Sequence, residues 1–150
     1  MNYQIKQIEE NEIPKAIDLV LKIFLEFDEQ AEQGIEEFKK FITIENINEK
    51  KLSQGLQLWG AYENNKIVGV IAFRKPLHIS LLFVDKDYQR QGIARRLFQV
   101  LLDSSHENIV TVCSSPYAVE IYKKLGFVPV GDENVKNGLR QTRMEYKRKA

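Results

Sequence analysis

The sequence predicts an α/β fold with a mixed sheet, in which a mostly antiparallel N-terminal meander precedes a strand–helix–strand unit. Three β-type runs follow one another in the middle of the chain, separated by short polar breaks: Gln57–Tyr62, Lys66–Phe73 and Leu77–Val84. A helix is then expected over 92–105, followed by an apolar strand over 109–113. A strand, a helix and a second strand in this order predict a mixed sheet with its ligand site near strand ends.

The N-terminal third is predicted to be mainly helical, after a short first strand at Tyr3–Gln7. A helix is expected over Pro14–Phe27, because proline suits a first helical turn and apolar residues recur three or four apart. A second helix is expected over Ile35–Ile42, and the polar segment 45–56 stays unassigned. The apolar positions of the first helix are Ile17, Val20, Leu21, Phe24 and Leu25.

Turn and cap residues delimit the remaining elements. Glu63-Asn64-Asn65 is a good hairpin turn, because asparagine tolerates positive φ. Ser115-Pro116 is expected to start a helix, with serine as N-cap, and Gly126 to end it as a left-handed C-terminal cap. The last strands are expected at Phe127–Val130 and Gln141–Tyr146. The buried stripe of the preceding helix is predicted to consist of Ile93, Leu97, Val100 and Leu101.

Length and charge describe an ordinary globular chain. Its 150 residues fit one domain, 1–150, and no repeat or Gly/Ser linker divides it. The net charge of +1 does not favour a nucleic-acid binder. The first 56 residues carry 7 basic and 12 acidic side chains, against 15 and 9 in the rest. This split suits a cationic ligand beside the first part and a polyanionic one beside the second, or simply two solvated faces.

The cysteine and histidine content and the hydropathy pattern limit the location and the chemistry. Cys113 is the only cysteine, so no internal disulfide can form, which suits a reducing compartment. The polar N-terminus is unlike a signal peptide, and no apolar run approaches the roughly 20 residues of a membrane span. A cytoplasmic protein with no membrane partner is therefore expected. Cys113 lies in an apolar run and is predicted to be buried. No metal is implied, because two histidines and one cysteine lack ligand spacing.

The junction at residues 84–95 predicts an anion site. Backbone N–H groups at a helix start have no partner within the helix and lie at the positive end of its dipole. Gly92 and Ala94 let a ligand approach the backbone, and Arg90, Arg95 and Arg96 add positive charge. The glycine and Lys-Ser/Thr pattern of the P-loop is absent, as are the three glycines of the dinucleotide fingerprint.

Two segments of the sequence resemble the GNAT superfamily of N-acetyltransferases. Gln89-Arg90-Gln91-Gly92-Ile93-Ala94 matches the family's Gln/Arg-x-x-Gly-x-Gly/Ala signature, which follows a strand often ending in valine. About 30 residues later, Ala118, Tyr122, Gly126 and Phe127 match Asn-x-x-Ala-x-x-x-Tyr-x-x-x-Gly-Phe, with Ser115 in place of the asparagine. The first 56 residues, where this family usually builds its acceptor pocket, add almost nothing to the match.

The resemblance implies a GNAT-like acyl-CoA N-acyltransferase fold and acetyl-CoA as co-substrate. The turn would hold the pyrophosphate of CoA through backbone amides, and Ser115 would lie near the pantetheine arm. The positions expected to bind the co-substrate are Phe83, Val84, Gln89, Arg90, Gln91, Gly92, Ile93, Ala94, Arg95 and Ser115.

Two residues are the expected catalytic groups. The resemblance places Tyr122 as the general acid that protonates the leaving thiolate. Members of the family often take the amine's proton with a carboxylate on the fourth strand, but Leu77–Val84 contains none. His78 lies where some members place a basic glutamate, and histidine titrates near neutral pH, so it is the candidate base. Asp85 and Glu120 are weaker alternatives.

The expected function is acetyl transfer from acetyl-CoA directly to a primary amine of a small molecule or protein. The acidic N-terminal part hints at a polyamine, an aminoglycoside, or a protein N-terminus or lysine as acceptor. Two alternatives stay open, namely a non-catalytic acyl-CoA-binding or sensing domain and a nucleotide-phosphate binder. A homodimer is compatible with the family, and the sequence does not decide it.

Overall fold

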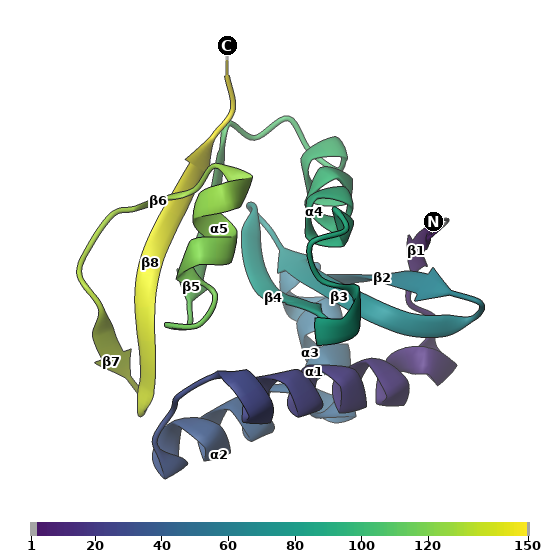
Figure 1. The fold of residues 1–150 in the computed structure, drawn as a ribbon, viewed down its shortest axis with the longest axis horizontal. Helices are drawn as coiled ribbons and strands as arrows, with labels where there is room; N and C mark the ends of the chain where they lie inside the picture. The colour runs from purple at the N-terminus through teal and green to yellow at the C-terminus, as the bar shows by residue number, and fades with distance from the viewer. Residues whose placement is uncertain (1–2, 150) are drawn as a thin grey trace.

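The computed structural model describes residues 3–149 as one mixed sheet with helices on both faces (Figure 1). The helices are α1 (Ile13–Phe27), α2 (Glu32–Phe41), α3 (Ile44–Gln54), α4 (Ile93–Asp103) and α5 (Val119–Leu125), with short 3-10 turns at Glu10–Glu12 and Lys86–Tyr88. The strands are β1 (Gln4–Gln7), β2 (Gln57–Glu63), β3 (Lys66–Arg74), β4 (His78–Val84), β5 (Ile109–Ser114), β6 (Val128–Pro129), β7 (Asn134–Lys136) and β8 (Leu139–Lys147). No helix within these residues is long and apolar enough to cross a membrane.

The sheet has the strand order β1-β2-β3-β4-β5-β8-β6, and β7 pairs with β8 outside this path. Strand pairs in it are antiparallel except for β4 and β5, which are parallel. The pairing of β4 with β5 is limited to His78 opposite Thr111 and Ile79 opposite Val112. Beyond these two pairs the strands separate, so the sheet divides into a β1–β4 half and a β5–β8 half (Figure 1). The predicted mixed sheet with its antiparallel meander is confirmed.

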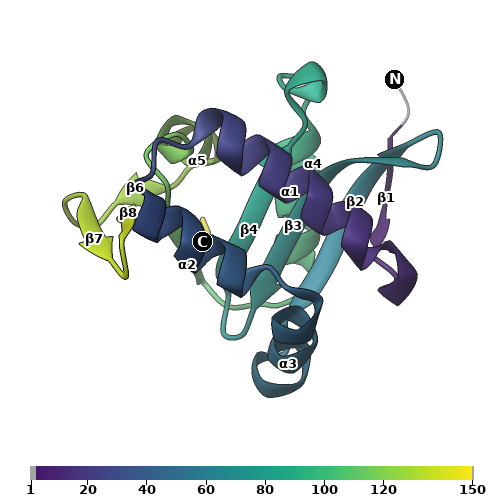
Figure 2. The same cartoon turned by 90° about the horizontal axis from the view of Figure 1, so that it is seen from below.

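Two hydrophobic clusters hold the layers together, one on each face of the sheet. On one face, α4 and α5 pack through Leu97, Leu101 and Leu125 against sheet residues such as Met144. On the other face, α1 and α2 lie across the strands (Figure 2), and the buried side chains include Val20. Apolar side chains alternate between these clusters along β3 and β4, as expected for a sheet covered on both sides.

Several elements of the N-terminal third differ from the prediction. α1 starts at Ile13, one residue early, and its buried face is rotated, because Leu25 is 51% exposed. α2 begins at Glu32 rather than residue 35. The unassigned segment forms α3, which is capped at both ends: the Thr43 hydroxyl accepts from the Asn46 N–H at 3.1 Å, and Gly55 takes a left-handed conformation. The buried side chains of α1 are Ile13, Ala16, Leu19, Val20, Ile23 and Phe24.

The C-terminal part confirms some boundaries and corrects others. Gly126 ends α5 with φ 109°, and the Phe127 N–H donates to the Tyr122 carbonyl at 3.0 Å, as expected for a left-handed cap. Ser115 is not the N-cap that was predicted, because residues 115–118 form a turn and α5 begins only at Val119. Cys113 is exposed rather than buried, since β5 buries only alternate residues.

The β7–β8 hairpin was missed by the sequence analysis, although its turn has a strong signature. Asn137 and Gly138 have φ of 53° and 83°, the pair of positive values that a two-residue hairpin turn requires. The same geometry occurs at Asn64 and Asn65, where the predicted β2–β3 turn is confirmed. The hairpin brings the start of β8 beside α2, where it forms one wall of the candidate site.

Candidate active site

The separation of β4 from β5 opens a cavity of about 720 Å³. At one end it is lined by the start of α4, with Arg90, Gly92 and Arg95. It continues between the two strands, past α5, and reaches the corner between α1 and α2 and the β7–β8 hairpin. One continuous space therefore connects the predicted anion site with the helices of the N-terminal third.

The turn that follows β4 is held by the Asp85 side chain. Asp85 is 3% exposed, and its carboxylate accepts from the Asp87 N–H at 3.1 Å and pairs with Lys22 at 3.6 Å. Its backbone N–H donates to the Val68 carbonyl at 2.9 Å, which fixes the turn to β3. Both roles are structural, which weakens Asp85 as an alternative base.

The start of α4 has the features of an anion-binding helix end. The first helical hydrogen bond runs from the Arg96 N–H to the Gly92 carbonyl at 3.0 Å. The N–H groups of Ile93, Ala94 and Arg95 therefore have no partner inside the helix. Gly92 has φ 81°, and among the described residues no atom lies within 4 Å of the position that a Cβ would take there. The open space and the unpaired amides fit a phosphate group.

The side chains around this turn stabilise its conformation. Arg95 donates to the Lys124 carbonyl at 2.7 Å and Arg96 to the Tyr3 carbonyl at 3.0 Å. The Tyr3 hydroxyl donates to the side-chain carbonyl of Gln91. Arg90 adopts φ 64°, a conformation that non-glycine residues rarely take. The partners of Arg95 and Arg96 are neutral backbone carbonyls, which do not balance their positive charges, and Arg95 lines the cavity.

Gln89 connects the turn with the opposite wall. Its side-chain amide donates to the Val84 carbonyl at 3.0 Å and to the Tyr117 hydroxyl at 3.2 Å. The Tyr117 ring stacks on Phe27, with 5.1 Å between the ring centroids. Gln89 therefore braces β4 against the segment before α5. Of the predicted binding positions, Gln91 is absent from the cavity lining, while Phe83, Val84, Gln89 and Ile93 belong to it.

Tyr122 lies on the cavity wall and is 4% exposed. Its ring meets Phe127 edge to face, with 5.3 Å between the centroids, so the side chain is fixed by packing. Burial raises the pKa of Tyr122 above its usual value, and the nearby Asp28 carboxylate raises it further. The phenol therefore keeps its proton at neutral pH, which is the state that a proton donor requires.

His78 lies on the same cavity, at the point where β4 still pairs with β5. Its Nδ1 is 2.8 Å from the Thr111 hydroxyl. Burial, together with the positive charges of Arg74 and Arg143, lowers the pKa of His78 to about 4. The imidazole is therefore neutral at pH 7, so it can accept a proton, but only as a weak base.

Asp28 is the cavity residue that the sequence analysis did not identify. It follows the last residue of α1, is 9% exposed, and one carboxylate oxygen, Oδ1, has no hydrogen-bond partner within residues 3–149. Burial raises the pKa of Asp28, while hydrogen bonds from the Ser115 side chain and the Tyr117 backbone lower it. Ser115 therefore contacts this carboxylate rather than capping α5.

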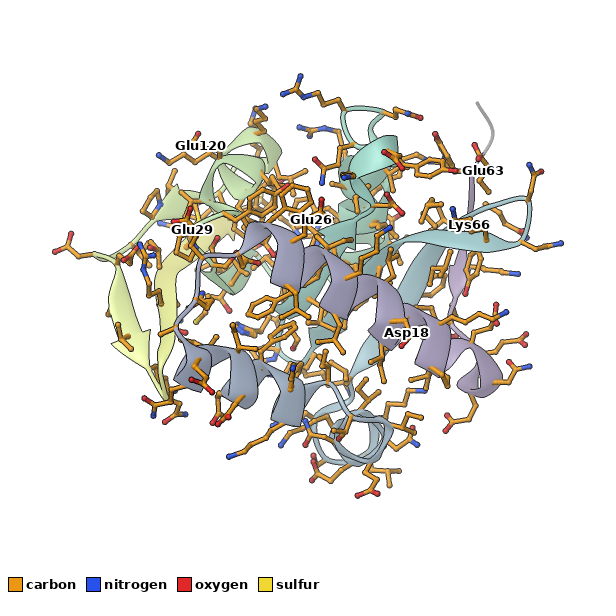
Figure 3. All side chains as sticks on the ribbon, turned by 60° about the horizontal axis from the view of Figure 1, so that its bottom comes forward. Asp18, Glu26, Glu29, Glu63, Lys66 and Glu120 are labelled. Carbon is orange, nitrogen blue, oxygen red and sulfur yellow. The ribbon has the colours of Figure 1, made fainter. Side chains whose placement is uncertain are left out.

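Glu120, the other alternative base, has a different environment. It points outward from α5 (Figure 3), is exposed, and pairs with Lys123 at 3.5 Å. It belongs to the rim of the cavity rather than its interior. Asp28 is thus the buried carboxylate of the cavity lining, and it lies close enough to Tyr122 to raise the pKa of that phenol.

The wall beyond Asp28 is largely aromatic. Phe24 and Phe38 stack with 3.9 Å between their centroids, and Phe38 lies 6.1 Å from Phe83. The apolar residues that line this part of the cavity are Ile23, Phe24, Phe38, Phe41, Leu81 and Phe83. Several phenylalanines of the first 56 residues thus line the cavity, although the sequence did not distinguish them from core residues.

A side-chain bridge joins the α1–α2 corner to β8. The Gln30 side chain accepts from the Arg140 N–H at 2.8 Å and donates to the Arg140 carbonyl at 3.1 Å. The Arg140 guanidinium donates to the Glu29 carbonyl at 3.2 Å and pairs with Glu133 at 3.1 Å. The far wall of the cavity is therefore tied to the end of α1 that carries Asp28.

Solved structures of similar fold come from acetyltransferases. A GCN5-related N-acetyltransferase from Rhodopseudomonas palustris matches with a TM-score of 0.79 at 20% identity, covering 98% of this chain and 96% of that one. The PaiA N-acetyltransferase from Thermoplasma acidophilum, solved in complex with coenzyme A, matches with a TM-score of 0.75 at 15% identity, covering 99% and 100%. At these identities the likeness establishes the fold.

Sequence comparison gives the same family. Two curated relatives are uncharacterised N-acetyltransferases: YafP of Escherichia coli, 37% identical over 79 residues, and YitH of Bacillus subtilis, 32% identical over 65. The matches cover 53% and 43% of this chain, but only 51% of YafP and 23% of YitH. The profile of the family described as "Acetyltransferase (GNAT) domain" matches residues 26–148. This match spans both predicted motifs and most of the chain, and the chain belongs to the GNAT family of acetyltransferases.

Proposed function

We propose that the protein transfers the acetyl group of acetyl-CoA directly to a primary amine. The observation that carries the proposal is the continuous cavity that connects the unpaired amides at the start of α4 with the buried hydroxyl-bearing ring of Tyr122. Such a space suits a long co-substrate with an anionic end and a reactive end. The coenzyme A bound to the Thermoplasma relative supports the same ligand here.

In the proposed site, the chain's own groups bind and neutralise the co-substrate. The amides of Ile93, Ala94 and Arg95 would hold its pyrophosphate, with the charges of Arg90 and Arg95 nearby. Acetyl-CoA supplies an activated acetyl group as a thioester. The gap between β4 and β5 leaves strand edges that can bind its extended arm through backbone hydrogen bonds.

The proton transfers can be assigned to residues on the cavity. An ammonium loses one proton before its nitrogen bonds to the acetyl carbon, and the nitrogen loses a second after the bond forms. The carbon–sulfur bond breaks, and the sulfur takes a proton from Tyr122, which regains one afterwards, so each turnover releases one proton. His78, neutral at pH 7, stays the predicted base.

The decisive experiment follows thiol release from acetyl-CoA with a panel of amines. Tyr122→Phe should lower kcat by at least about 100-fold, the usual contribution of a general acid, with the Kd for acetyl-CoA unchanged. Tyr146→Phe is the matched control, because that ring packs on Phe98 and Phe127 outside the cavity lining. Equal rates for Tyr122→Phe and the parent would remove Tyr122 from the mechanism.

The same assay tests the predicted base and the alternative functions. His78→Ala should lower turnover, and unchanged turnover across pH 6 to 9 would show that His78 is not the base. Acetyl-CoA binding without thiol release for any amine would indicate a sensing domain instead. Stronger thermal stabilisation by ATP than by CoA would indicate a nucleotide binder. A cytoplasmic location, a homodimer, and the absence of nucleic-acid and membrane partners stay predictions.

A further inference from the structure

We propose that Asp28 binds the ammonium group of the acceptor and that the aromatic wall beside it selects a monoamine with an apolar body. The proposal rests on the function proposed above and names the class of its acceptor. The expected acceptors are arylalkylamines or alkylamines. Polyamines, aminoglycosides and lysine side chains are not expected to be good acceptors.

The first step of the argument is the unpaired oxygen of Asp28. A carboxylate that is 9% exposed needs donors for its oxygens, because an unpaired buried acceptor costs free energy. Ser115 and the Tyr117 N–H donate to the carboxyl, but Oδ1 has no partner among the described residues. Asp28 lines the cavity although Oδ1 itself is enclosed, so a donor brought by a ligand can complete its hydrogen bonds once the carboxylate rotates toward the cavity.

The second step is the position of Asp28 relative to the reaction. Asp28 lies near enough to Tyr122 for its charge to raise the pKa of the phenol. An amine bound at Oδ1 would therefore be held beside the proposed proton donor. Burial raises the pKa of Asp28 and thereby disfavours the charged carboxylate. An ammonium bound beside it would offset this effect by stabilising the negative charge.

The third step concerns the body of the acceptor. Phe24, Phe38, Phe41 and Phe83 face the space beyond Asp28, and an apolar group would gain free energy by covering them. A second ammonium there would lose part of its hydration, with Glu37, next to Phe38 on α2, as the carboxylate available to it. Arg74 and Lys136, which also line the cavity, would repel it and outnumber Glu37, while Arg140 is already paired with Glu133 at 3.1 Å.

The acidic excess of the N-terminal part does not contradict an acceptor that carries a single positive charge. Asp18, Glu26 and Glu29 project from the outer side of α1 and the following segment (Figure 3), and none of them lines the cavity. Glu26 pairs with Lys86 at 2.9 Å on that surface. Of the 12 acidic residues in the first 56, only Asp28 and Glu37 line the cavity, so most of the charge that suggested a polycationic acceptor lies outside the site.

The first experiment measures KM for a series of n-alkylamines from propylamine to hexylamine, with phenethylamine and spermidine as further acceptors. Each methylene that the wall buries should lower KM by about fourfold. A KM that does not change with chain length, or a kcat/KM for spermidine above that for phenethylamine, would overturn the proposal.

The second experiment tests Asp28 by comparing a charged ligand with a neutral one. In the parent, phenethylamine should bind the CoA complex more tightly than 2-phenylethanol, by about 10- to 100-fold, as expected for a hydrogen bond to a charged group. Asp28→Asn should remove this difference by weakening the amine alone. Glu29→Gln, the same change of charge at the exposed neighbouring residue, should leave the ratio as in the parent.

The outcomes separate this proposal from the one on which it rests. If Asp28→Asn weakens both ligands equally, the residue is structural and the proposal fails, whether or not transfer occurs. If spermidine is the better acceptor, acetyl transfer stands and this proposal fails. If phenethylamine binds in an Asp28-dependent way without thiol release, the binding proposal stands and the transferase function fails.

Discussion

Gly92 offers a direct test of the proposed pyrophosphate site. Its substitution has two separable effects: a loss of folding stability from the strained backbone, and a loss of acetyl-CoA affinity from a clash with the phosphate. The residue has φ 81°, and a Cβ placed on it would meet no atom of residues 3–149 within 4 Å. Gly92→Ala therefore brings the free-energy cost of a left-handed conformation, about 1 kcal/mol, without an internal clash. For a chain of this size the melting temperature should fall by about 2 to 4 °C.

The effect on acetyl-CoA should be larger than this backbone cost. The open space at Gly92 is where a phosphate would approach the amides of Ile93 and Ala94, so an added methyl group displaces the ligand from them. Losing one charge-assisted hydrogen bond corresponds to about 1.5–3 kcal/mol, which is at least about a tenfold increase in Kd. Isothermal titration with acetyl-CoA, paired with thermal unfolding of the same samples, measures both quantities.

Two other glycines serve as matched controls. Gly55 has φ 64°, and the atoms nearest to a Cβ there belong to the flexible Lys75 side chain, at 3.3 Å and beyond. Gly55→Ala should therefore lower stability as much as Gly92→Ala and leave acetyl-CoA binding unchanged. Gly131→Ala should change neither quantity, because no described atom lies within 4 Å of the added carbon and φ is not positive there. If Gly92→Ala binds acetyl-CoA as tightly as Gly55→Ala, the turn does not hold the pyrophosphate.

Two further predictions concern stability. The pKa of His78 is lowered from 6.5 to about 4, so the folded state binds fewer protons than the unfolded chain between these values, and stability falls as the pH drops through this window. His78 alone should make the protein about 2 kcal/mol less stable at pH 5 than at pH 7. Urea unfolding of His78→Gln should lack this loss, whereas a variant of the exposed His106, His106→Gln, should retain it. Gly34→Ala would place its Cβ 2.6 Å from the Gly138 carbonyl oxygen, so α2 must move away from the hairpin. It should lower the free energy of unfolding by about 1–3 kcal/mol, and an unchanged urea midpoint would contradict this close contact.

The sequence predicted the elements whose local signals agree with their packing. The β2–β4 meander has strands of continuous apolar residues and an Asn-Asn turn, and the structure contains it. α4 buries Ile93, Leu97 and Leu101 of the predicted stripe, whereas Val100 is only half-buried and Phe98 is buried instead. The alternation of strand and helix around it was sufficient to predict the mixed sheet.

Other elements depend on tertiary contacts that a local pattern does not contain. α3 is mostly polar, so its periodicity is weak, and only Ile47 is buried. Ser115 and Pro116 look like a helix start, but this segment forms a turn whose serine contacts Asp28, a residue 87 positions earlier. The β7–β8 turn has the Asn-Gly signature, but β7 was missed because Asn134–Lys136 is exposed and has no apolar alternation.

The residues of the candidate site fall into the same two groups, those that a local motif identifies and those that only the tertiary structure identifies. The anion turn and Tyr122 lie in contiguous motifs whose spacing determines their geometry, so the sequence was sufficient to locate them. Asp28 is one of 12 acidic residues in the first 56, and nothing in its neighbourhood distinguishes it. It becomes distinct only because α1 ends where β4 and β5 separate, so that a carboxylate at this end is enclosed by Ser115 and Tyr117. Under the acceptor proposal made above, the position at which α1 ends decides which amine is bound, while the anion turn stays the same.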